Sequence, residues 1–269
     1  MQLKDKTLVL TGATGGIGSA LAAELAQEGA HLILVGRDQS KLNMLRSSLK
    51  HCQKAHLIYV ADISEQKQRD DLVAYCLQLG IDGLINNAGL SHFGLLQDTP
   101  DATISALVQM NLEVPMLLTK AFLPVLTSAE QGLLVNIGSA FGSIGYPGYS
   151  IYCGSKFGLR GFTEAVRREC ADSNLKVLHI APRSTHTAIN SSAVFAMNKE
   201  LGNTVDMPEL VASQIVRRIK ADKWGSCVLG WPEKLYAIVN SILPGLTDQS
   251  IKKVLAKIKR FTLDKNVGN

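Results

Sequence analysis

Short apolar runs alternate with longer helical segments along most of this chain, and this order constrains the fold more than any other feature. Strands are expected at 7–11, 31–36, 55–61, 81–89 with its exit loop, 132–139, 175–182 and 227–230. Helices are expected between them, at 16–28, 38–50, 65–79 and 101–127, after Ser150 and after Pro208. Six βα alternations predict an α/β fold, a doubly wound parallel sheet of about seven strands with helices on both faces. In such sheets ligands bind beyond the carboxyl ends of the strands.

Length and composition fit a single globular domain. The chain has 269 residues, 46% of them hydrophobic and 19% charged, which suffices for a sizeable core. We expect residues 1–230 to form this domain and residues 231–269 to form a helical extension. The first residues lack the apolar segment of a signal peptide, no apolar run is long enough to span a membrane, and the five cysteines form no C-x-x-C pair. These features predict a cytoplasmic protein without disulfides.

The net charge of +5 comes from the end of the chain. Residues 249–269 contain one acid and six basic residues, namely Lys252, Lys253, Lys257, Lys259, Arg260 and Lys265. The remainder is neutral, so the sequence gives no reason to expect a nucleic-acid-binding face.

A glycine-rich segment, TGATGGIG from Thr11 to Gly18, links the first expected strand to the first expected helix. Glycine lets the backbone turn tightly and approach a phosphate, and a helix N-terminus offers free N–H groups. The segment could be no more than a tight turn. Its position within a βαβ unit favours a dinucleotide site built around Gly12, Gly16 and Gly18.

The end of the second strand indicates which dinucleotide is bound. Proteins that select NAD usually place an acid there to bind the ribose 2′-hydroxyl. Here Gly36 takes that position and Arg37 follows, and a guanidinium suits a 2′-phosphate. Arg37 could also be merely solvated, and Asp38 could be either the ribose ligand or the N-cap of the next helix. We expect NADP(H).

Three tyrosines occur at intervals of three residues in YPGYSIYCGSK: Tyr146, Tyr149 and Tyr152. Only Tyr152 is followed four residues later by a cation, Lys156, which lies on the same face if the segment is helical. A nearby ammonium favours the phenolate and lowers the pKa of the phenol. The pair could also be an ordinary buried tyrosine beside a lysine. With the motifs that follow, we interpret Tyr152 as the acid/base and the other two tyrosines as pocket wall.

Over nearly its full length the chain resembles the short-chain dehydrogenase/reductase family, which has a Rossmann-like fold. TGATGGIG matches the family's T-G-x-x-x-G-x-G, NNAG (86–89) matches its fourth-strand motif, and Tyr152 with Lys156 matches Y-x-x-x-K. Asn111 and Ser139 match the remaining catalytic positions. Ser139 stands thirteen residues before Tyr152, as it does in the family.

The resemblance implies roles for these residues. Ser139 would bind the substrate oxygen, Tyr152 would deliver the proton, Lys156 would also hold the nicotinamide ribose, and Asn111 would hold a water linked to Lys156. The implied cofactor-binding residues are Gly12, Thr14, Gly16, Ile17, Gly18, Arg37, Asp62, Ile63, Asn87, Ala88, Gly89, Tyr152, Lys156, Thr185 and Thr187. No metal site is expected. We also expect a homo-oligomer, either a dimer or a tetramer.

One position departs from the family pattern. The family usually has Pro-Gly after the sixth strand, whereas this chain has Pro182 followed by Arg183. The side chain of Arg183 could point to solvent, or it could meet an anionic substrate group or the cofactor pyrophosphate. His92 and His186, in strand-end loops, either line the pocket or are solvated. The following loop, about 186–207, is mostly small and apolar and is expected to contact an apolar substrate.

These observations predict an oxidoreductase that transfers a hydride between NADP(H) and a carbonyl or secondary alcohol of an apolar substrate, such as a ketone or a 3-oxoacyl thioester. A cofactor-sensing binding or regulatory protein without turnover is the alternative, although such relatives typically lose the tyrosine or the lysine. An epimerase or dehydratase is disfavoured by the short chain.

The extension after residue 230 has apolar residues at helical spacing in both of its halves. In the second half, Ile251, Val254, Leu255 and Ile258 share one face and lysines occupy the others. These helices could cover the substrate pocket or a subunit interface. Alternatively, the basic helix could bind an anionic membrane surface or an acidic carrier protein.

Overall fold

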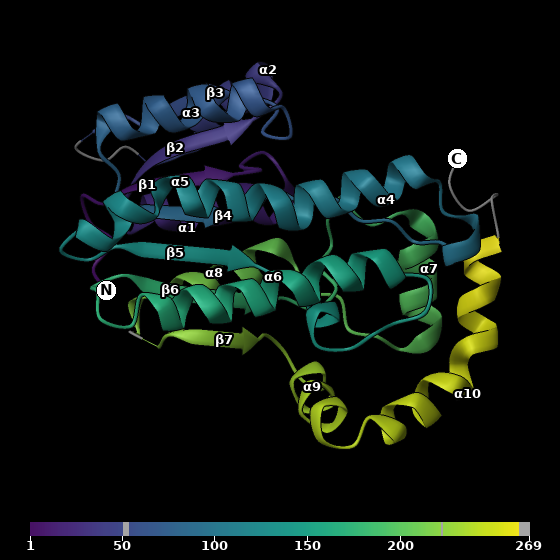
Figure 1. Ribbon diagram of the computed structural model, residues 1–269. Helices are drawn as coiled ribbons and strands as arrows, with labels where there is room; N and C mark the ends of the chain where they lie inside the picture. Colours follow the sequence, from purple (N-terminus) through teal and green to yellow (C-terminus); the bar gives the residue numbers. More distant parts are fainter. Residues whose placement is uncertain (51–53, 222, 264–269) are drawn as a thin grey trace.

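The computed structural model describes residues 1–50, 54–221 and 223–263 (Figure 1). Cys52, Asp264 and Lys265, which entered the cysteine and charge arguments, lie outside the described residues, as do residues 266–269 of the expected extension. The described strands form one sheet in the order β3-β2-β1-β4-β5-β6-β7. Every neighbouring pair is parallel. The predicted doubly wound fold is therefore confirmed.

The strands follow the predicted apolar runs closely. They are β1 (Thr7–Thr11), β2 (His31–Gly36), β3 (Leu57–Val60), β4 (Gly83–Asn86), β5 (Leu133–Ile137), β6 (Lys176–Ala181) and β7 (Gly225–Val228). The chain winds outward from β1 to β3 and then returns to add β4 on the other side of β1. This reversal of direction between β1 and β4 is where a doubly wound sheet opens a crevice for ligands.

Ten α-helices are described. They are α1 (Gly16–Gln27), α2 (Gln39–Ser48), α3 (Gln66–Leu79), α4 (Asp101–Val108), α5 (Val114–Ser128), α6 (Ser150–Glu169), α7 (Ser192–Leu201), α8 (Pro208–Lys220), α9 (Glu233–Ile242) and α10 (Pro244–Leu263). The single helix predicted over 101–127 is divided by a π-helical turn, Gln109–Glu113, which carries the buried Asn111. The region 186–207 is not entirely a loop, because α7 lies within it.

The core consists of one apolar layer on each face of the sheet. Along β1, Leu8 and Leu10 pack on the side of α1 and α8, while Val9 packs on the side of α3, α5 and α6. Neighbouring side chains of a strand point to opposite faces, so a strand covered on both faces is expected to be mostly apolar. All five residues of β1 are buried, which explains the apolar run Leu8–Leu10 between its two threonines.

The two C-terminal helices lie beyond the carboxyl edge of the sheet. In Figure 1, α9 follows β7 below the domain and α10, in yellow, rises beside α7. Ile258 and Phe261 of α10 are buried against a cluster that includes Tyr149, Val194 and Met197. The extension is thus packed against the domain. Among the described helices, none combines the length and the apolar character required to cross a lipid bilayer.

Candidate active site

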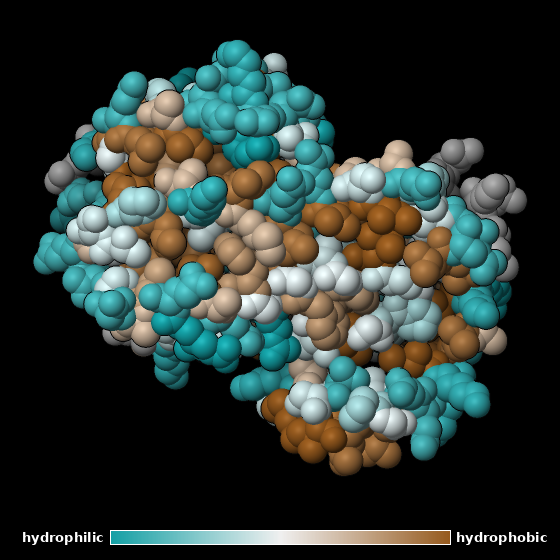
Figure 2. All heavy atoms as spheres, viewed as in Figure 1, coloured by the Kyte–Doolittle hydropathy of each residue, from teal (hydrophilic) through white to brown (hydrophobic). Residues whose placement is uncertain are grey.

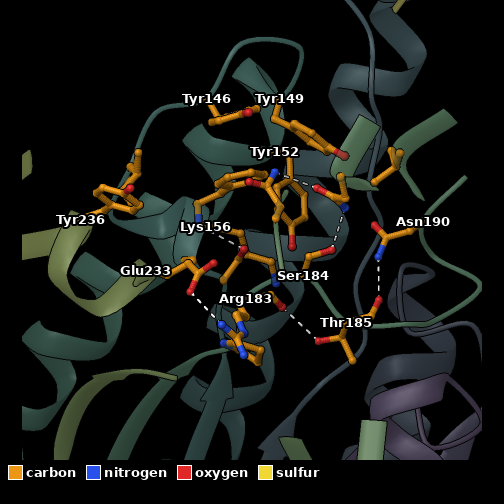
Figure 3. Close-up of a pocket in the computed structure, with 18 of the residues that line it drawn as sticks. Tyr146, Tyr149, Tyr152, Lys156, Arg183, Ser184, Thr185, Asn190, Glu233 and Tyr236 are labelled. Carbon is orange, nitrogen blue, oxygen red and sulfur yellow. Dashed lines mark hydrogen bonds and ion pairs between the residues drawn. The ribbon is translucent and has the colours of Figure 1, made fainter. Parts of the chain in front are cut away.

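A cavity of about 600 Å³ opens at the carboxyl ends of the strands, where the fold predicts a ligand site (Figure 3). Its walls come from the ends of β5 and β6, from α6 and α7, and from the C-terminal helices. Eight of the predicted site residues line it: Ile17, Asn87, Gly89, Ser139, Tyr152, Lys156, Thr185 and Thr187. Segments far apart in the sequence therefore meet in one place.

Tyr152 and Lys156 lie one helical turn apart on α6, as their spacing predicted. The Lys156 Nζ atom lies 5.8 Å from the centroid of the Tyr152 ring. Nζ also donates a hydrogen bond of 3.0 Å to the carbonyl oxygen of Ile137 at the end of β5. The ammonium is buried and fixed between α6 and the sheet, with Tyr152 beside it at the cavity.

The pKa of Tyr152 is shifted in the direction opposite to the one expected from its spacing to Lys156. Burial raises the pKa of Tyr152 above its usual value, and a hydrogen bond with Ser139 opposes this only in part. Burial also lowers the pKa of Lys156 to about 8. Removal from water disfavours the charged form of each group. In the protein alone, therefore, Lys156 does not bring the pKa of Tyr152 below that of a free phenol, and Tyr152 stays protonated at neutral pH.

Ser139 is held in a position to donate its proton. Its Oγ accepts a hydrogen bond of 3.1 Å from the backbone N–H of Phe141, at the start of a short 3₁₀ turn, Ala140–Gly142. The hydroxyl hydrogen is then free to point at Tyr152, and the presence of Ser139 lowers the pKa of that phenol against the larger effect of burial. A substrate oxygen placed between the two hydroxyl groups would accept from both of them.

Asn111 is completely buried below the cavity floor. Its Oδ1 accepts from the Leu90 N–H at 2.8 Å, and its Nδ2 donates to the Leu90 carbonyl at 2.9 Å and to Ser155 Oγ at 3.1 Å. A Cβ at Gly89 would lie 3.1 Å from Asn111 Oδ1 and 3.7 Å from Lys156 Nζ. Asn111 thus fixes the loop after β4 beside the lysine, and its expected part in a water link to Lys156 stays a prediction.

The glycine-rich turn between β1 and α1 forms a cradle into which side chains would not fit. Gly12 has φ +61°, and a Cβ at Gly18 would lie 2.2 Å from the Gly12 carbonyl oxygen. No side chain caps the N-terminus of α1, so its first N–H groups are free to donate hydrogen bonds to an anion. A Cβ at Gly16 would meet Thr187 at 2.4 Å. The geometry fits the pyrophosphate of a dinucleotide.

The loop after β4 supports this cradle. Asn87 Nδ2 donates to the carbonyl oxygens of Thr11 and Gly12, both at 3.0 Å. The Cα of Ala88 lies 2.7 Å from the position a Cβ would take at Gly12, and Thr14 Oγ1 lies 3.5 Å from the corresponding position at Gly36. Asn87 and Ala88 therefore shape the glycine turn. Asn87 and Gly89 also line the cavity.

At the other end of the crevice, Asp38 proves to be a helix cap. Its Oδ1 accepts a hydrogen bond of 3.0 Å from the Lys41 N–H at the start of α2.

The Arg37 side chain is 70% exposed, and its Nη1 lies 3.9 Å from Oδ2 of Asp62. A hydrogen bond of 2.6 Å from Ser64 is the main cause that lowers the pKa of Asp62. Ile63 is buried behind it. An exposed, charged guanidinium is thus available beside the expected adenosine site.

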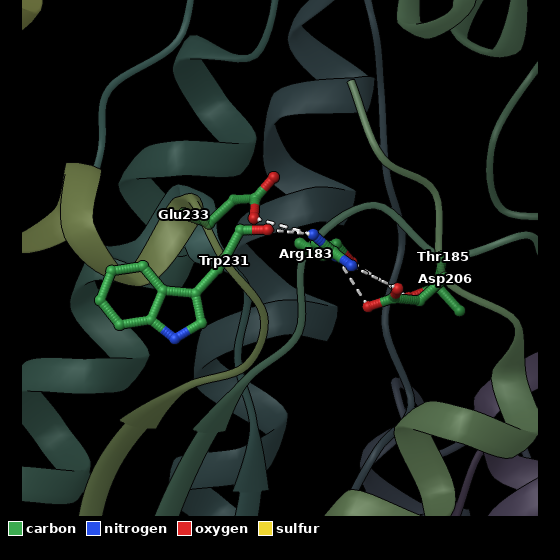
Figure 4. Close-up of polar contacts among 5 residues, drawn as sticks. All are labelled: Arg183, Thr185, Asp206, Trp231 and Glu233. Carbon is green, nitrogen blue, oxygen red and sulfur yellow. Dashed lines mark hydrogen bonds and ion pairs between the residues drawn. The ribbon is translucent and has the colours of Figure 1, made fainter. Parts of the chain in front are cut away.

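Arg183, which replaces the family's glycine, does not point to solvent but lies at the cavity wall, and its expected contact with an anionic substrate group or the pyrophosphate stays a prediction. Its side chain is only 12% exposed. It donates to both carboxylate oxygens of Asp206, at 2.8 and 2.7 Å, to Glu233 at 3.3 Å, and to the carbonyl oxygen of Trp231 (Figure 4). We call Arg183, Asp206 and Glu233 the Arg183 clamp. It joins the end of β6 to the chain before α8 and to the start of α9.

The outer wall of the cavity is formed mostly by aromatic and apolar side chains. Tyr146 and Tyr149 line it, as predicted, and burial raises the pKa of both phenols. His92 and His186 are not among its lining residues, and the ring of His186 stacks on Phe195.

Sequence reasoning missed a polar strip on the α7 side. Asn198 Nδ2 donates to Ser184 Oγ at 3.0 Å, and Asn203 Nδ2 donates to Asn198 Oδ1 at 3.0 Å. Asn203 also lowers the pKa of Tyr146, against the larger effect of burial. A buried asparagine within the otherwise apolar segment FAMN was the available signal, because a buried amide needs partners.

Comparison with known proteins agrees with this geometry. The sequence model of the short chain dehydrogenases matches residues 6–197, so the chain belongs to the short-chain dehydrogenase/reductase family. It is 30% identical over 259 residues to a frog protein, dehydrogenase/reductase SDR family member 7B of Xenopus laevis, covering 91% of this chain and 80% of that protein. It is 30% identical over 235 residues to 3-oxoacyl-[acyl-carrier-protein] reductase FabG of Rickettsia bellii, covering 86% and 95%.

Solved structures show the same fold. A dehydrogenase/reductase from Sinorhizobium meliloti superposes with a TM-score of 0.76 at 23% identity, covering 85% of this chain and 95% of that one. Members of the family use a nicotinamide cofactor, and the glycine cradle and the free N-terminus of α1 fit such a cofactor. The site is therefore that of an oxidoreductase.

Proposed function

We propose that this protein is an NADP(H)-dependent oxidoreductase acting on a carbonyl or secondary alcohol group of an apolar substrate. The observation that carries the proposal is the meeting of Ser139, Tyr152 and Lys156 at the inner end of a cavity whose outer part is apolar. These three side chains stand together at the inner end, where a reacting oxygen would bind, and the polar strip of Asn198 and Asn203 lies apart on the α7 side. The FabG relative is named for a 3-oxoacyl substrate, which makes a 3-oxoacyl thioester one candidate among ketones.

When bound, the nicotinamide supplies or accepts the hydride. Ser139 donates a hydrogen bond to the substrate oxygen and so stabilises the negative charge that develops on it during reduction. Tyr152 is protonated at neutral pH because burial raises its pKa, and it therefore serves as the proton donor in that direction. The buried ammonium of Lys156 stabilises the phenolate that remains once the proton has left.

The phosphate-binding features support NADP(H) over NAD(H). Asp38 is committed to capping α2, which leaves Gly36 and the exposed Arg37 where a 2′-substituent would lie. A guanidinium pairs well with a phosphate and offers nothing comparable to a 2′-hydroxyl.

The apolar character of the substrate follows from the cavity walls. Ile144, Ile189, Val194, Met197 and Leu201 line it on one side, and Leu235, Val239, Leu246, Ile251 and Val254 of the C-terminal helices line it on the other. Transfer of each methylene group from water to such a wall contributes about 0.8 kcal/mol. Longer alkyl ketones should consequently be better substrates than short ones.

The test is a series of alkyl ketones and 3-oxoacyl thioesters of increasing chain length, with NADPH oxidation followed by absorbance. We expect kcat/KM to rise by about threefold to fourfold per methylene until the cavity is full. A protein that binds NADPH but oxidises it with none of these substrates would instead be a cofactor sensor without turnover.

A further inference from the structure

The segment from Trp231 to Leu246 exposes a concentration of large apolar side chains. Seven residues in this short stretch are between 45% and 69% exposed: Trp231, Leu235, Tyr236, Ile238, Ile242, Leu243 and Leu246. They lie just before α9, on α9, and on the turn and first residues of α10, and we call them the apolar tip. In Figure 2 this region forms a brown lobe that projects below the domain. Monomeric proteins rarely leave so contiguous an apolar surface in water without a partner.

The apolar tip is anchored to the domain by two hydrogen bonds of α9. Glu233, at the start of α9, accepts a hydrogen bond from Arg183, and Asn240 Nδ2 donates to the Ser143 carbonyl at 2.9 Å. These two contacts lie on the inner side of α9. They leave Ile238 and Ile242 facing outward, so their exposure is a consequence of how the helix is anchored.

The apolar tip is continuous with the interior of the cavity. Leu235, Tyr236 and Leu246 are exposed, and they also line the cavity. Val239, Ile251 and Val254 continue the same apolar surface inward toward Tyr152. A molecule that left an apolar phase at the tip could reach the catalytic end along an apolar path.

The charges around the tip are mainly positive. Lys234 lies over the ring of Trp231, with Nζ 5.9 Å from its centroid. Lys252 and Lys253, early in α10, are exposed and form no ion pair among the residues that the structure describes. Of the two acids of the described extension, Glu233 is paired within the Arg183 clamp and Asp248 remains.

The apolar face of α10, which the sequence suggested as a membrane-binding face, is not available for that role. Ile258 is fully buried, and Val254 and Phe261 pack against the same cluster. Within the described extension, the apolar tip is therefore the apolar surface left for docking.

We propose that the apolar tip inserts into the surface of a membrane containing anionic lipid and takes up its apolar substrate from the bilayer. An aromatic and aliphatic surface bordered by lysines has the composition of an interfacial membrane contact. Tryptophan suits the boundary between headgroups and acyl chains because its ring is apolar and its N–H is polar. The delivery of substrate rests on the proposed function, whereas the docking itself does not.

The experiment measures flotation with vesicles of phosphatidylcholine, with and without phosphatidylglycerol. The Trp224→Phe variant leaves Trp231 as the only tryptophan, since the chain has two, and its fluorescence then reports on the tip. We expect the protein to float with anionic vesicles at low salt, with a blue shift of Trp231 emission, and to bind less at high salt.

Matched variants separate docking from folding and from catalysis. Ile242→Ser with Leu243→Ser should weaken binding to anionic vesicles by at least about tenfold, because two exposed apolar side chains lose their contact with lipid. Neither residue lines the cavity, so turnover of a water-soluble carbonyl compound should be unchanged. Leu77→Ser with Leu79→Ser removes similarly exposed side chains from α3 and should leave vesicle binding as it is.

Three results would overturn the docking proposal. The first is a wild-type protein that stays free of anionic vesicles at low salt with unchanged Trp231 emission. The second is a molecular mass that halves in the Ile242→Ser, Leu243→Ser variant, which would show that a second copy covers the tip. The third is binding to an acidic carrier protein that this double variant abolishes while vesicle binding persists. Loss of turnover with intact vesicle binding would instead contradict only the proposed function.

Discussion

Arg183 and Asp206 form a two-point ion pair, with Nε and Nη2 of the guanidinium 2.8 and 2.7 Å from the two carboxylate oxygens. Asp206 is also joined to the end of β6 through its backbone, because its N–H donates to Ser184 at 2.9 Å and its carbonyl oxygen accepts from His186 at 2.8 Å. The two ends of the segment that carries α7 are therefore fastened together at the base. Glu233 extends the same contact to the C-terminal helices.

Replacing Arg183 with methionine should destabilise the protein by about 3 kcal/mol or more, because Asp206 would remain buried without its counter-charge. Asp206 is only 5% exposed, so water cannot replace the lost contacts. Chemical denaturation measures the change. The double variant Arg183→Met with Asp206→Leu is the control, and it should recover much of the loss because no unpaired charge is left. Equal unfolding midpoints for Arg183→Met and the wild type would contradict this account.

Replacing Arg37 with alanine should remove most of the preference for NADPH. We expect the wild type to bind NADPH at least about tenfold more tightly than NADH, which corresponds to about 1.4 kcal/mol. Titration of both cofactors against the two proteins measures the preference. Arg46→Ala is a suitable control, because Arg46 is an exposed arginine on the neighbouring α2. Equal dissociation constants for NADPH and NADH in the wild type would rule out this role.

Replacing Tyr152 with phenylalanine should lower kcat by about a hundredfold or more while the dissociation constant for NADPH changes little. The reason is that only the proton donor is lost, and the apolar ring still fills its place in the wall. Tyr149→Phe is the matched control: Tyr149 neighbours Tyr152, with ring centroids 6.0 Å apart, but lies farther along the wall. Retention of a tenth of the wild-type kcat by Tyr152→Phe would show that another group delivers the proton.

The buried ammonium of Lys156 should make stability depend on pH. Its pKa is about 8 in the folded protein against 10.5 for a free lysine, so the unfolded chain binds the proton more tightly. Below pH 8 the folded protein therefore carries the full destabilisation, about 3 kcal/mol, and this loss disappears as the pH rises from about 8 to 10.5.

Lys156→Met isolates this effect. The variant should be more stable than the wild type at pH 7, and the difference in unfolding free energy should shrink across the same pH range. Denaturation of both proteins at several pH values measures it. A difference that stays constant from pH 7 to pH 10 would show that the ammonium is not destabilised by its surroundings.

The direction of the reaction should also respond to pH. Because burial raises the pKa of Tyr152, the protonated phenol needed for reduction is present throughout the neutral range. Oxidation of an alcohol needs the phenolate instead. The rate of oxidation should accordingly increase with pH over a range in which the rate of reduction does not change with pH. Steady-state rates in both directions, with saturating cofactor, test this, and an oxidation rate that falls as the pH rises would contradict it.

Features set by local sequence could be predicted well. The strands are mostly apolar because helices cover both faces of the sheet, and such runs can be recognised directly in the sequence. The pairing of Tyr152 with Lys156 follows from helix geometry, and the glycine cradle follows from a turn between a strand and a helix. Each of these depends on residues that are close together in the chain.

Features set by distant contacts could not be predicted. The partners of Arg183 lie 23 and 50 residues further along the chain, so no local pattern connects them. The pKa of Tyr152 was expected to fall because Lys156 is near in sequence, but burial, which depends on distant parts of the chain, raises it. Asp38 had two possible roles, and the position of the Lys41 N–H, which the sequence does not give, shows that it caps α2.

The Arg183 clamp has a further consequence for how this enzyme could change its substrate. The chain is held at residues 183–185 and again at Asp206. The segment between them is therefore a loop whose two ends stay fixed whatever its length. The entropy of closing a loop increases only slowly with the number of residues. Sequence and length between 188 and 205 can therefore vary while the end of β6 stays fixed. Grafting this segment from relatives, with Thr187 kept beside Gly16 and with Val194 and Met197 kept against Tyr149, offers a direct way to exchange substrate preference.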